Sequence, residues 1–428
     1  MDYFKPISIS LSPNTEKDDI RLAFRLLFQS WRWKTINNKQ LTINTLEEEF
    51  KRYLGVKFAV SFNSGRSAFL AILNSLSLNK GDEVLLQAFT CNAVPNPIIW
   101  AGLKPIYVDC DERNFNIDIE DLKRTLRQAQ GKKPKVLMVQ HTFGLPADLD
   151  EILEICQENK LILIEDCAHS LGATYKGKKV GNFGKASFFS FGRDKIISSV
   201  YGGMAVTNDE NLAKKIKKFQ EKCDLPSNFW IFQQLLHPIL VNFLILPLYG
   251  FFDIGRLILL FFQKIKILSK AVSKKEKKGK KPVYFPKRFP NALAVLALNQ
   301  LKKLERFILH QKEIARFYGE NLKNTNFILP KENQERVYMR YSVLIGDYET
   351  DEILKKSRKS KIFLNDGWRK TPITPPDTNQ KAMEYLSGSC STAEKIAKTI
   401  LNLPTHINIS QKDAQKIIDS LKNSIKHL

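Results

Sequence analysis

An apolar run that ends at two acidic residues is the feature that most constrains the fold of this chain. Leu161-Ile162-Leu163-Ile164 contains no polar residue and is followed directly by Glu165-Asp166. A short, wholly apolar run is typical of a parallel strand that is buried on both faces. Open α/β sheets bind their ligands at the carboxyl ends of such strands. We therefore expect Asp166 to lie at a ligand-binding edge of a sheet.

A lysine farther along the chain supplies a second reactive group. Lys195 follows Phe189-Ser190-Phe191 and precedes Gly202-Gly203. A pyridoxal phosphate (PLP) site needs a lysine that can lose its proton in a dry pocket, and a carboxylate that keeps the pyridine nitrogen protonated. Lys195 and Asp166 are candidates for these catalytic roles. The alternative is that Lys195 is one of many lysines and that Asp166 only caps a strand.

The order of predicted elements indicates an α/β protein. Strand and helix patterns alternate from about Leu41 to Asp224, as expected for a doubly wound, mostly parallel sheet. The chain of 428 residues exceeds what one core usually supports. We expect a lead-in at 1–40, a large domain at 41–285 and a smaller C-terminal α+β domain at 286–428.

Two patterns define the smaller domain. A periodic apolar face predicts one long helix that begins at Asn291 and leads into this domain. Alternating residues from Val337 to Ile345 predict a strand within it.

Composition limits the compartment and the partners. Six cysteines show neither paired metal-ligand spacing nor a dense disulfide framework, so we expect no metal and a reducing cytoplasm. The first residues lack an apolar run after a basic start, so no secretory signal is expected. The net charge of +23 is compatible with nucleic acid, nucleotide-sugar phosphates or anionic lipids. Because the basic residues match no recognisable nucleic-acid module, we expect no specific nucleic-acid partner.

Several segments, in their order and spacing, resemble the nucleotide-sugar aminotransferases of the DegT/StrS group, which are fold type I PLP-dependent transferases. The match runs over most of the chain. The segments that carry it are Asn63-Ser64-Gly65-Arg66-Ser67-Ala68-Phe69, Gly81-Asp82-Glu83-Val84, Gly102 to Asp109, Glu165-Asp166-Cys167-Ala168-His169, Phe189-Ser190-Phe191 with Lys195, Gly202-Gly203, and Leu403-Pro404-Thr405-His406.

The resemblance implies a role for each matched site residue. Lys195 would bind the cofactor covalently and move a proton to and from the substrate carbon, and Asp166 would pair with the pyridinium. His169 would contact the phenolic oxygen or the ring edge. The phosphate would be held by Ser190 and by two backbone amides. The cofactor-binding residues that the resemblance implies are Gly65, Arg66, Asp166, His169, Ser190 and Lys195.

The phosphate assignment also has physical support. A small-residue turn at Gly65 follows the apolar strand Phe58 to Val60 and precedes a helix-like run from Ser67. Such a helix start presents free N–H groups and a positive dipole end to an anion. The alternative is an ordinary helix cap without a ligand.

Some positions depart from the family pattern. Cys91 follows Thr90 where the family usually has an aromatic residue that stacks on the cofactor ring, so stacking is weakened or supplied elsewhere. Pro286-Lys287-Arg288 stands where the family has a cross-subunit asparagine-tyrosine-arginine motif, which leaves Arg288 as the possible cross-subunit contact. Three residues before the lysine are unusual and affect the expected substrate geometry: Gly192, Arg193 and Asp194.

The resemblance implies an activity and partners. A homodimer would transfer an amino group, with glutamate as the donor, to a keto group of a nucleotide-linked sugar for surface polysaccharide or glycolipid synthesis. A related branch replaces the lysine with histidine and dehydrates sugars, whereas Lys195 indicates transamination. The alternatives are a PLP enzyme of the same fold with another keto or amino substrate, and a membrane-attached binding protein without turnover.

An insertion at 224–285 lies outside the family pattern. No charged residue occurs from Phe229 to Phe252, although prolines and polar residues interrupt the apolar run. Lys264 to Lys281 then contains nine lysines and a single Glu276. We expect residues 229–281 to form two short helices and a basic stretch that attach the enzyme peripherally, or monotopically, to an anionic inner leaflet. The alternative is that the apolar part packs on the enzyme or its dimer partner and the lysines form a solvated loop.

Overall fold

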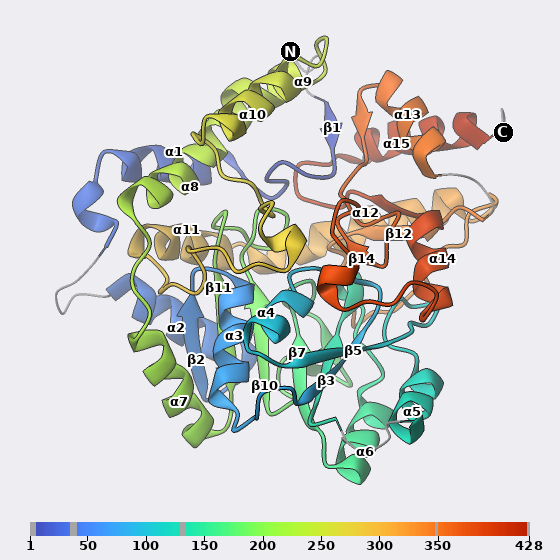
Figure 1. Cartoon of the computed structure of the whole chain (residues 1–428). Coiled ribbons are helices and arrows are strands. Elements are labelled where there is room, and N and C mark those ends of the chain that lie inside the picture. Colours follow the sequence, from blue (N-terminus) through green and yellow to red (C-terminus); the bar gives the residue numbers. More distant parts are fainter. Residues whose placement is uncertain (1–5, 35–40, 129–133, 347–349, 426–428) are drawn as a thin grey trace.

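A seven-stranded sheet forms the centre of the protein (Figure 1). The computed structural model describes residues 6–34, 41–128, 134–346 and 350–425. The strand order is β2-β11-β10-β7-β6-β3-β5, and only β11 runs antiparallel to its neighbours. The strands are β2 (Phe58–Phe62), β3 (Glu83–Gln87), β5 (Lys104–Val108), β6 (Val136–Gln140), β7 (Ile162–Asp166), β10 (Ala186–Ser190) and β11 (Gly203–Thr207).

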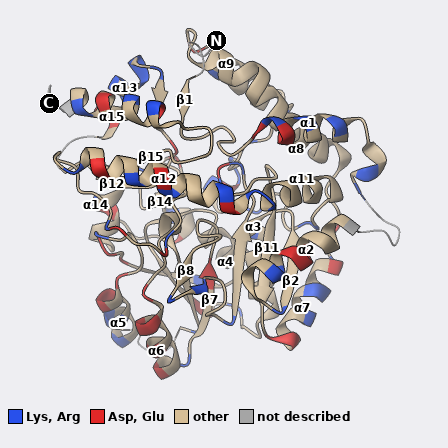
Figure 2. Cartoon of the chain, turned by 180° about the vertical axis from the view of Figure 1, so that it is seen from behind, with Lys and Arg blue, Asp and Glu red and all other residues tan. Residues whose placement is uncertain are grey.

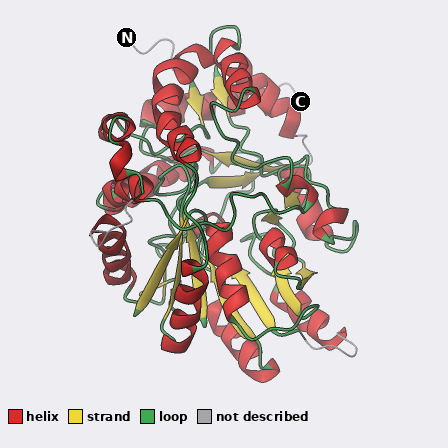
Figure 3. Cartoon of the chain, turned by 60° about the vertical axis from the view of Figure 1, so that its left-hand side comes forward, coloured by secondary structure: helices red, strands yellow, loops and turns green. Residues whose placement is uncertain are grey.

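Helices cover both faces of this sheet (Figure 3). Apolar side chains of α3, α4 and α7 pack on one face, and those of α2, α5, α6 and α11 pack on the other. The expected doubly wound α/β architecture is therefore confirmed. The helices are α2 (Leu41–Leu54), α3 (Gly65–Ser75), α4 (Pro95–Trp100), α5 (Ile119–Gln128), α6 (Leu149–Asn159), α7 (Glu210–Glu221) and α11 (Asn291–Leu301).

The C-terminal part adds a smaller α+β unit. Its antiparallel pair β12 (Tyr341–Leu344) and β15 (Ile400–Leu403) packs with helices around a separate apolar core. A short parallel pair, β4 (Thr90–Cys91) with β14 (Ile373–Thr374), connects this unit to the large domain. The remaining helices of the unit are α12 (Leu304–Leu322), α13 (Thr350–Lys359), α14 (Ser391–Thr399) and α15 (Gln411–Ile425).

Two predicted elements differ from the structure. The single long helix from Asn291 is wrong, because the chain turns between α11, which packs on α2, and α12, which packs on α15. The strand predicted from Val337 to Ile345 is shorter than expected. The amide of Val337 donates instead to the carbonyl of Gly144 in the large domain (N···O 3.1 Å), so regular pairing begins at Tyr341.

The N-terminal residues, which the sequence suggested to be a lead-in, pack on both domains. Strand β1 (Ile7–Ser8) pairs in parallel with β13 (Ile362–Phe363) of the smaller unit. Helix α1 (Lys17–Leu27) packs against the insertion helix α8 (Asn228–Leu240). Between them, the Asn14 amide donates to the carbonyls of Lys195 and Ile196, both at 3.0 Å. This segment therefore supports the turn that carries the reactive lysine.

The insertion forms two helical segments, but the first is longer than the short helix that the sequence predicted (Figure 1). Helix α8 continues through a π-helical turn (Val241–Ile245) into α9 (Leu246–Tyr249), and α10 (Ile254–Lys264) packs back on it. The continuous helix Asn228–Tyr249 is long and apolar enough to cross a membrane, yet half of its most apolar window is buried within the protein. Part of the apolar run is therefore packed inside the protein.

A close backbone approach fixes the start of α3. A Cβ atom added to Gly203 on β11 would lie 2.4 Å from the amide nitrogen of Gly65. We predict that Gly203→Ala lowers the free energy of unfolding by about 2 kcal/mol or more, because backbone atoms must separate. Urea denaturation measures this loss. In Gly250→Ala, the added Cβ meets only the flexible Lys361 side chain, at 3.4 Å, so an equal loss in that control would contradict the prediction.

Candidate active site

Lys195 and Asp166 meet in one cavity at the carboxyl edge of the sheet. Asp166 is the last residue of β7, and Lys195 lies in the turn that follows β10, the neighbouring parallel strand. Both residues line a cavity of about 340 Å³. The expected placement of these two groups follows from parallel pairing, because the ends of neighbouring strands meet at the same edge.

Burial makes the ionised form of Asp166 unfavourable unless a cation lies beside it. The side chain is almost fully buried, and one carboxylate oxygen accepts the amide of Ala168 at 2.9 Å. Loss of water raises the pKa of Asp166 to about 6, despite the opposing effects of that amide and of Lys195. Among the described residues, Asp166 forms no ion pair within 4 Å, so a protonated pyridine nitrogen would supply the cationic partner that this carboxylate lacks.

The start of α3 forms an anion cradle beside the cavity. The Ser64 hydroxyl accepts the amide of Ser67 at 3.0 Å and so caps the helix. A Cβ at Gly65 would lie only 3.0 Å from the Cβ of Ser190, so the two residues are in direct contact. The cradle therefore fits a phosphate group held by the helix start and by the Ser190 hydroxyl. The predicted residues Gly65, Arg66 and Ser190 all line the cavity.

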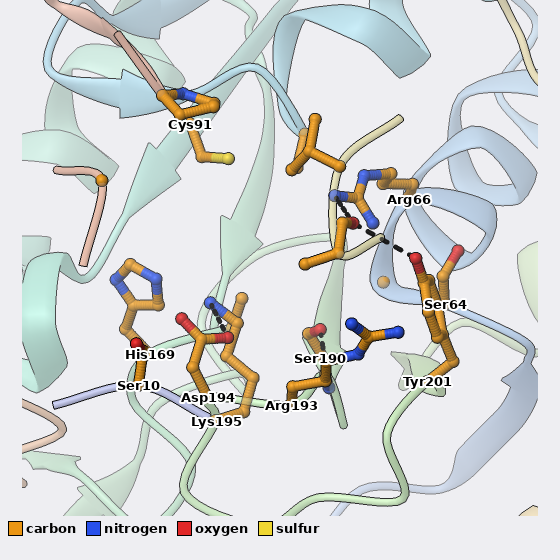
Figure 4. Close-up of a pocket in the computed structure, with 18 of the residues that line it drawn as sticks. Ser10, Ser64, Arg66, Cys91, His169, Ser190, Arg193, Asp194, Lys195 and Tyr201 are labelled. Carbon is orange, nitrogen blue, oxygen red and sulfur yellow. Dashed lines mark hydrogen bonds and ion pairs between the residues drawn. The ribbon is translucent and has the colours of Figure 1, made fainter. Parts of the chain in front are cut away.

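Two arginines lie on the same side of the cavity, and of the two only Arg193 has no ion pair within 4 Å among the described residues. Figure 4 shows Arg66, Arg193 and Tyr201 on the side of the cavity opposite His169. The Arg193 guanidinium lies over the Tyr201 ring, 5.5 Å from its centre. The Arg66 guanidinium is paired with Glu276, with Nε 2.9 Å from Oε1. This half of the cavity can bind phosphate groups by charge as well as by backbone dipoles.

His169 presents a neutral ring to the cavity. Its Nδ1 accepts the amide of Phe143 at 3.4 Å, and the two rings stack with centres 5.6 Å apart. Burial, together with nearby Lys195, holds the pKa of His169 well below its usual value. The ring also packs edge to face with Trp368 at 5.0 Å. His169 is thus placed to contact a flat cofactor, and Trp368 offers a second aromatic surface where Cys91 offers none.

Sequence reasoning missed an ionic cluster next to Lys195. The Lys195 amine lies 4.0 Å from Asp194, and Asp194 and Asp366 both pair with the buried Arg340, at 3.5 and 3.3 Å. Burial alone would raise the pKa of Asp194, but Lys195 and Arg340 lower it to about 2. Arg340 and Asp366 come from the smaller domain. The unusual Asp194 was the sole sequence signal of this cluster.

Arg288 does not join this cavity. Its main chain bridges to Phe62, and its amide donates to the carbonyl of Asp224 at 3.0 Å. The Nε atom of its side chain is buried and has no hydrogen-bond partner among the described residues. A contact between Arg288 and the cavity of a second subunit stays a prediction.

A second buried acidic group has a structural role. Glu165 accepts the amides of Gly181, Phe183 and Gly184, each at 2.7 Å, and contacts His141 at 3.2 Å. These bonds fix the loop that precedes β10. Cys167 also lies close to this pair. The carboxylate is already saturated with donors, so we assign no metal to the group.

The insertion covers the cavity. His237, Leu259 and Gln263 line it from the helices, and Ala271 and Val272 line it from the lysine-rich stretch. That stretch is bound to the enzyme through its backbone and its single acid. Three side chains of the enzyme donate to backbone carbonyls of the stretch: the Asn96 side-chain amide to Glu276, the Trp100 indole to Gly279 and the Tyr201 hydroxyl to Lys270. In addition, Arg66 pairs with the carboxylate of Glu276.

Comparison with known proteins places this arrangement in a family. The model of the DegT/DnrJ/EryC1/StrS aminotransferase family matches residues 17–230 and 262–422. The chain belongs to this family. It is therefore a PLP-dependent aminotransferase of fold type I, as the sequence indicated. Between the two matched segments only residues 231–261 are unmatched. The expected insertion at 224–285 is therefore too long, because the family model also includes the lysine-rich stretch.

Relatives and solved structures agree with this assignment. GDP-perosamine synthase of Caulobacter vibrioides is 26% identical over 383 residues, which is 88% of each chain. The structure of Helicobacter pylori PseC, an aminotransferase of pseudoaminic acid biosynthesis, has a TM-score of 0.74 at 22% identity and covers 99% of this chain and 100% of that one. Bacillus subtilis NtdA, with bound PMP, also has a TM-score of 0.74, at 20% identity, and covers 100% and 86%.

The raised pKa of Asp166 predicts that Asp166→Asn stabilises the apoprotein but weakens PLP binding. Because the unfolded carboxyl has the lower pKa, ionisation in the folded apoprotein costs stability as pH rises from 3.8 through about 6. Asp166→Asn should therefore raise apoprotein stability at pH 7 by at most about 3 kcal/mol. The same substitution should weaken PLP binding at least about tenfold, since the pyridinium loses its partner.

Denaturation of the apoprotein and PLP titration measure the two effects of Asp166→Asn. The stability difference from wild type should vanish below pH 3.8, where the wild-type carboxyl is also protonated. A variant that is less stable than wild type at pH 7, or that binds PLP equally well, would contradict the assignment.

Proposed function

We propose that this aminotransferase converts the keto group of a nucleotide-linked sugar into an amino group, with glutamate as the donor. The observation that carries the proposal is the shared cavity of Lys195 and Asp166, with an anion cradle and two arginines on one side. Two relatives support it: GDP-perosamine synthase of Caulobacter vibrioides matches 88% of this chain, and a UDP-N-acetyl-3-dehydro-alpha-D-glucosamine 3-aminotransferase of Acidithiobacillus ferrooxidans matches 40% of it. The product would serve surface polysaccharide or glycolipid synthesis.

Each side chain would have a distinct task. Bound PLP supplies the electron sink that allows an amino group and a proton to leave the same carbon. Asp166 would hold the pyridine nitrogen in its protonated form, and Lys195 would carry the proton at the reacting carbon. Asp194 lies beside the lysine amine, and Arg340 neutralises the charge of that carboxylate. His169 would direct the N–H on its Nε2 to the phenolic oxygen, because its Nδ1 already accepts an amide.

We also propose a homodimer whose partner subunit completes the phosphate side. Arg288 is the candidate for that contribution, since it stands where the family has a cross-subunit arginine and does not line the cavity of its own subunit. A second proposal places the enzyme on the cytoplasmic face of a membrane through residues 229–281. The exposed aromatic residues Phe243, Phe252 and Phe261 support that attachment.

The substrate class is tested by amino-group transfer from glutamate with the PLP-loaded enzyme. Keto-sugar nucleotides should be aminated with a kcat/KM at least about tenfold above that of simple keto acids, because cationic groups line one side of the cavity. Lys195→Ala should abolish transfer to both acceptors and serves as the control. A preference for simple keto acids would favour another substrate of the same fold, and no transfer at all would favour a binding protein.

A further inference from the structure

The outer face of α10 is apolar where a surface helix is normally polar. Leu257, Leu260, Phe261 and Ile265 are exposed in a helical repeat, and Leu257 and Phe261 are 61% and 56% exposed. The opposite face of α10 contributes Leu259 and Gln263 to the active-site cavity. A helix with one face on the enzyme and an exposed apolar stripe on the other needs a second apolar environment.

The turn before α10 extends this apolar surface. Phe251 and Phe252 form an edge-to-face pair, with ring centres 4.9 Å apart, and Phe252 is 85% exposed. Phe252 and Asp253 have positive φ values of 45° and 57°. For a phenylalanine, that backbone conformation is strained, so the surrounding structure must stabilise it while the ring stays exposed.

Positive charge surrounds the apolar surface. Arg256 and Lys264 are exposed at the two ends of the α10 stripe, and α10 itself contains no acidic residue. Arg358, Lys359 and Lys361 line a cavity of about 410 Å³ together with Phe252 and Asp253. Asp253, the only acid among the described residues that line this cavity, is paired with Arg358. Figure 2 shows the insertion end at α9 largely without charge and α13 with Lys and Arg.

We propose that this face docks on an anionic phospholipid surface. We call it the docking face and define it by Phe251, Phe252, Leu257, Leu260, Phe261, Ile265, Arg256, Lys264, Arg358, Lys359 and Lys361. The apolar stripe enters the interface, and the cations at its ends and in the cavity contact lipid phosphates. This proposal rests on the proposed membrane attachment, but it places the lipid contact at the docking face. The lysine-rich stretch 264–281, beyond Lys264 itself, covers the active site instead of forming the main lipid contact.

Vesicle flotation of the full-length, PLP-loaded enzyme tests the docking face. Wild type should float with vesicles that contain phosphatidylglycerol, bind vesicles of phosphatidylcholine alone more weakly, and lose binding as salt rises. A triple variant, Phe252→Ser with Leu257→Ser and Phe261→Ser, should bind at least about a hundredfold more weakly. Lys359→Gln with Lys361→Gln should weaken binding about fivefold for each charge removed.

Two matched controls separate this face from other surfaces. Leu309→Ser with Leu386→Ser removes equally exposed apolar side chains, at 67% and 74%, outside the docking face. Lys274→Gln with Lys278→Gln removes two exposed lysines of the lysine-rich stretch. Both controls should bind within about twofold of wild type. All variants should keep the wild-type melting temperature and the visible absorbance of bound PLP, because the altered side chains are exposed.

Three outcomes would overturn the inference. If Lys274→Gln with Lys278→Gln loses binding while the triple variant keeps it, membrane attachment stands but the docking face is wrong. If wild type binds no vesicles, both attachment and docking face fail, while amino transfer in solution remains a separate result. If the triple variant instead converts a dimer into a monomer by light scattering, the face is an interface between two copies of the chain.

Discussion

The buried carboxylate of Asp166 is the constraint on which the active site depends. An ionised acid in this position is costly because a single protein hydrogen bond replaces its water. The two other acids near Lys195, Asp194 and Asp366, share Arg340. Asp166 is thus left for a positive group that comes from outside the chain. We propose that the protonated nitrogen of PLP is that group, whose binding would convert an unfavourable charge into an ion pair.

The sheet and the central pair of residues could be predicted from the sequence because they depend on local patterns. The apolar run before Glu165 fixed a buried parallel strand, and its carboxyl end fixed the position of Asp166. Gly65 and Ser190 likewise lie where strand ends and a helix start were expected. The cluster of Arg340, Asp366 and Trp368 could not be predicted, because tertiary folding brings it from the smaller domain.

The insertion shows where sequence patterns leave two outcomes open. Apolar composition alone could not separate lipid contact from protein contact, and the structure shows both buried and exposed apolar side chains in the insertion. The helices bury Trp230, Ile231 and Val241, whereas Phe261 of α10 and Phe252 in the turn before it are exposed. The lysine-rich stretch was expected at a membrane or in solvent. Its backbone instead bonds to the enzyme, and Glu276 holds it to Arg66 beside the phosphate cradle.

The most direct test of the active site is to locate the lysine that binds PLP. The enzyme would be saturated with PLP, reduced with borohydride, digested and examined by mass spectrometry. The structure predicts a single reduced adduct on the peptide that contains Lys195, among the many lysines of a strongly basic chain. Adducts spread over surface lysines, or none at saturation, would contradict the assignment of Lys195 and Asp166 as the cofactor site.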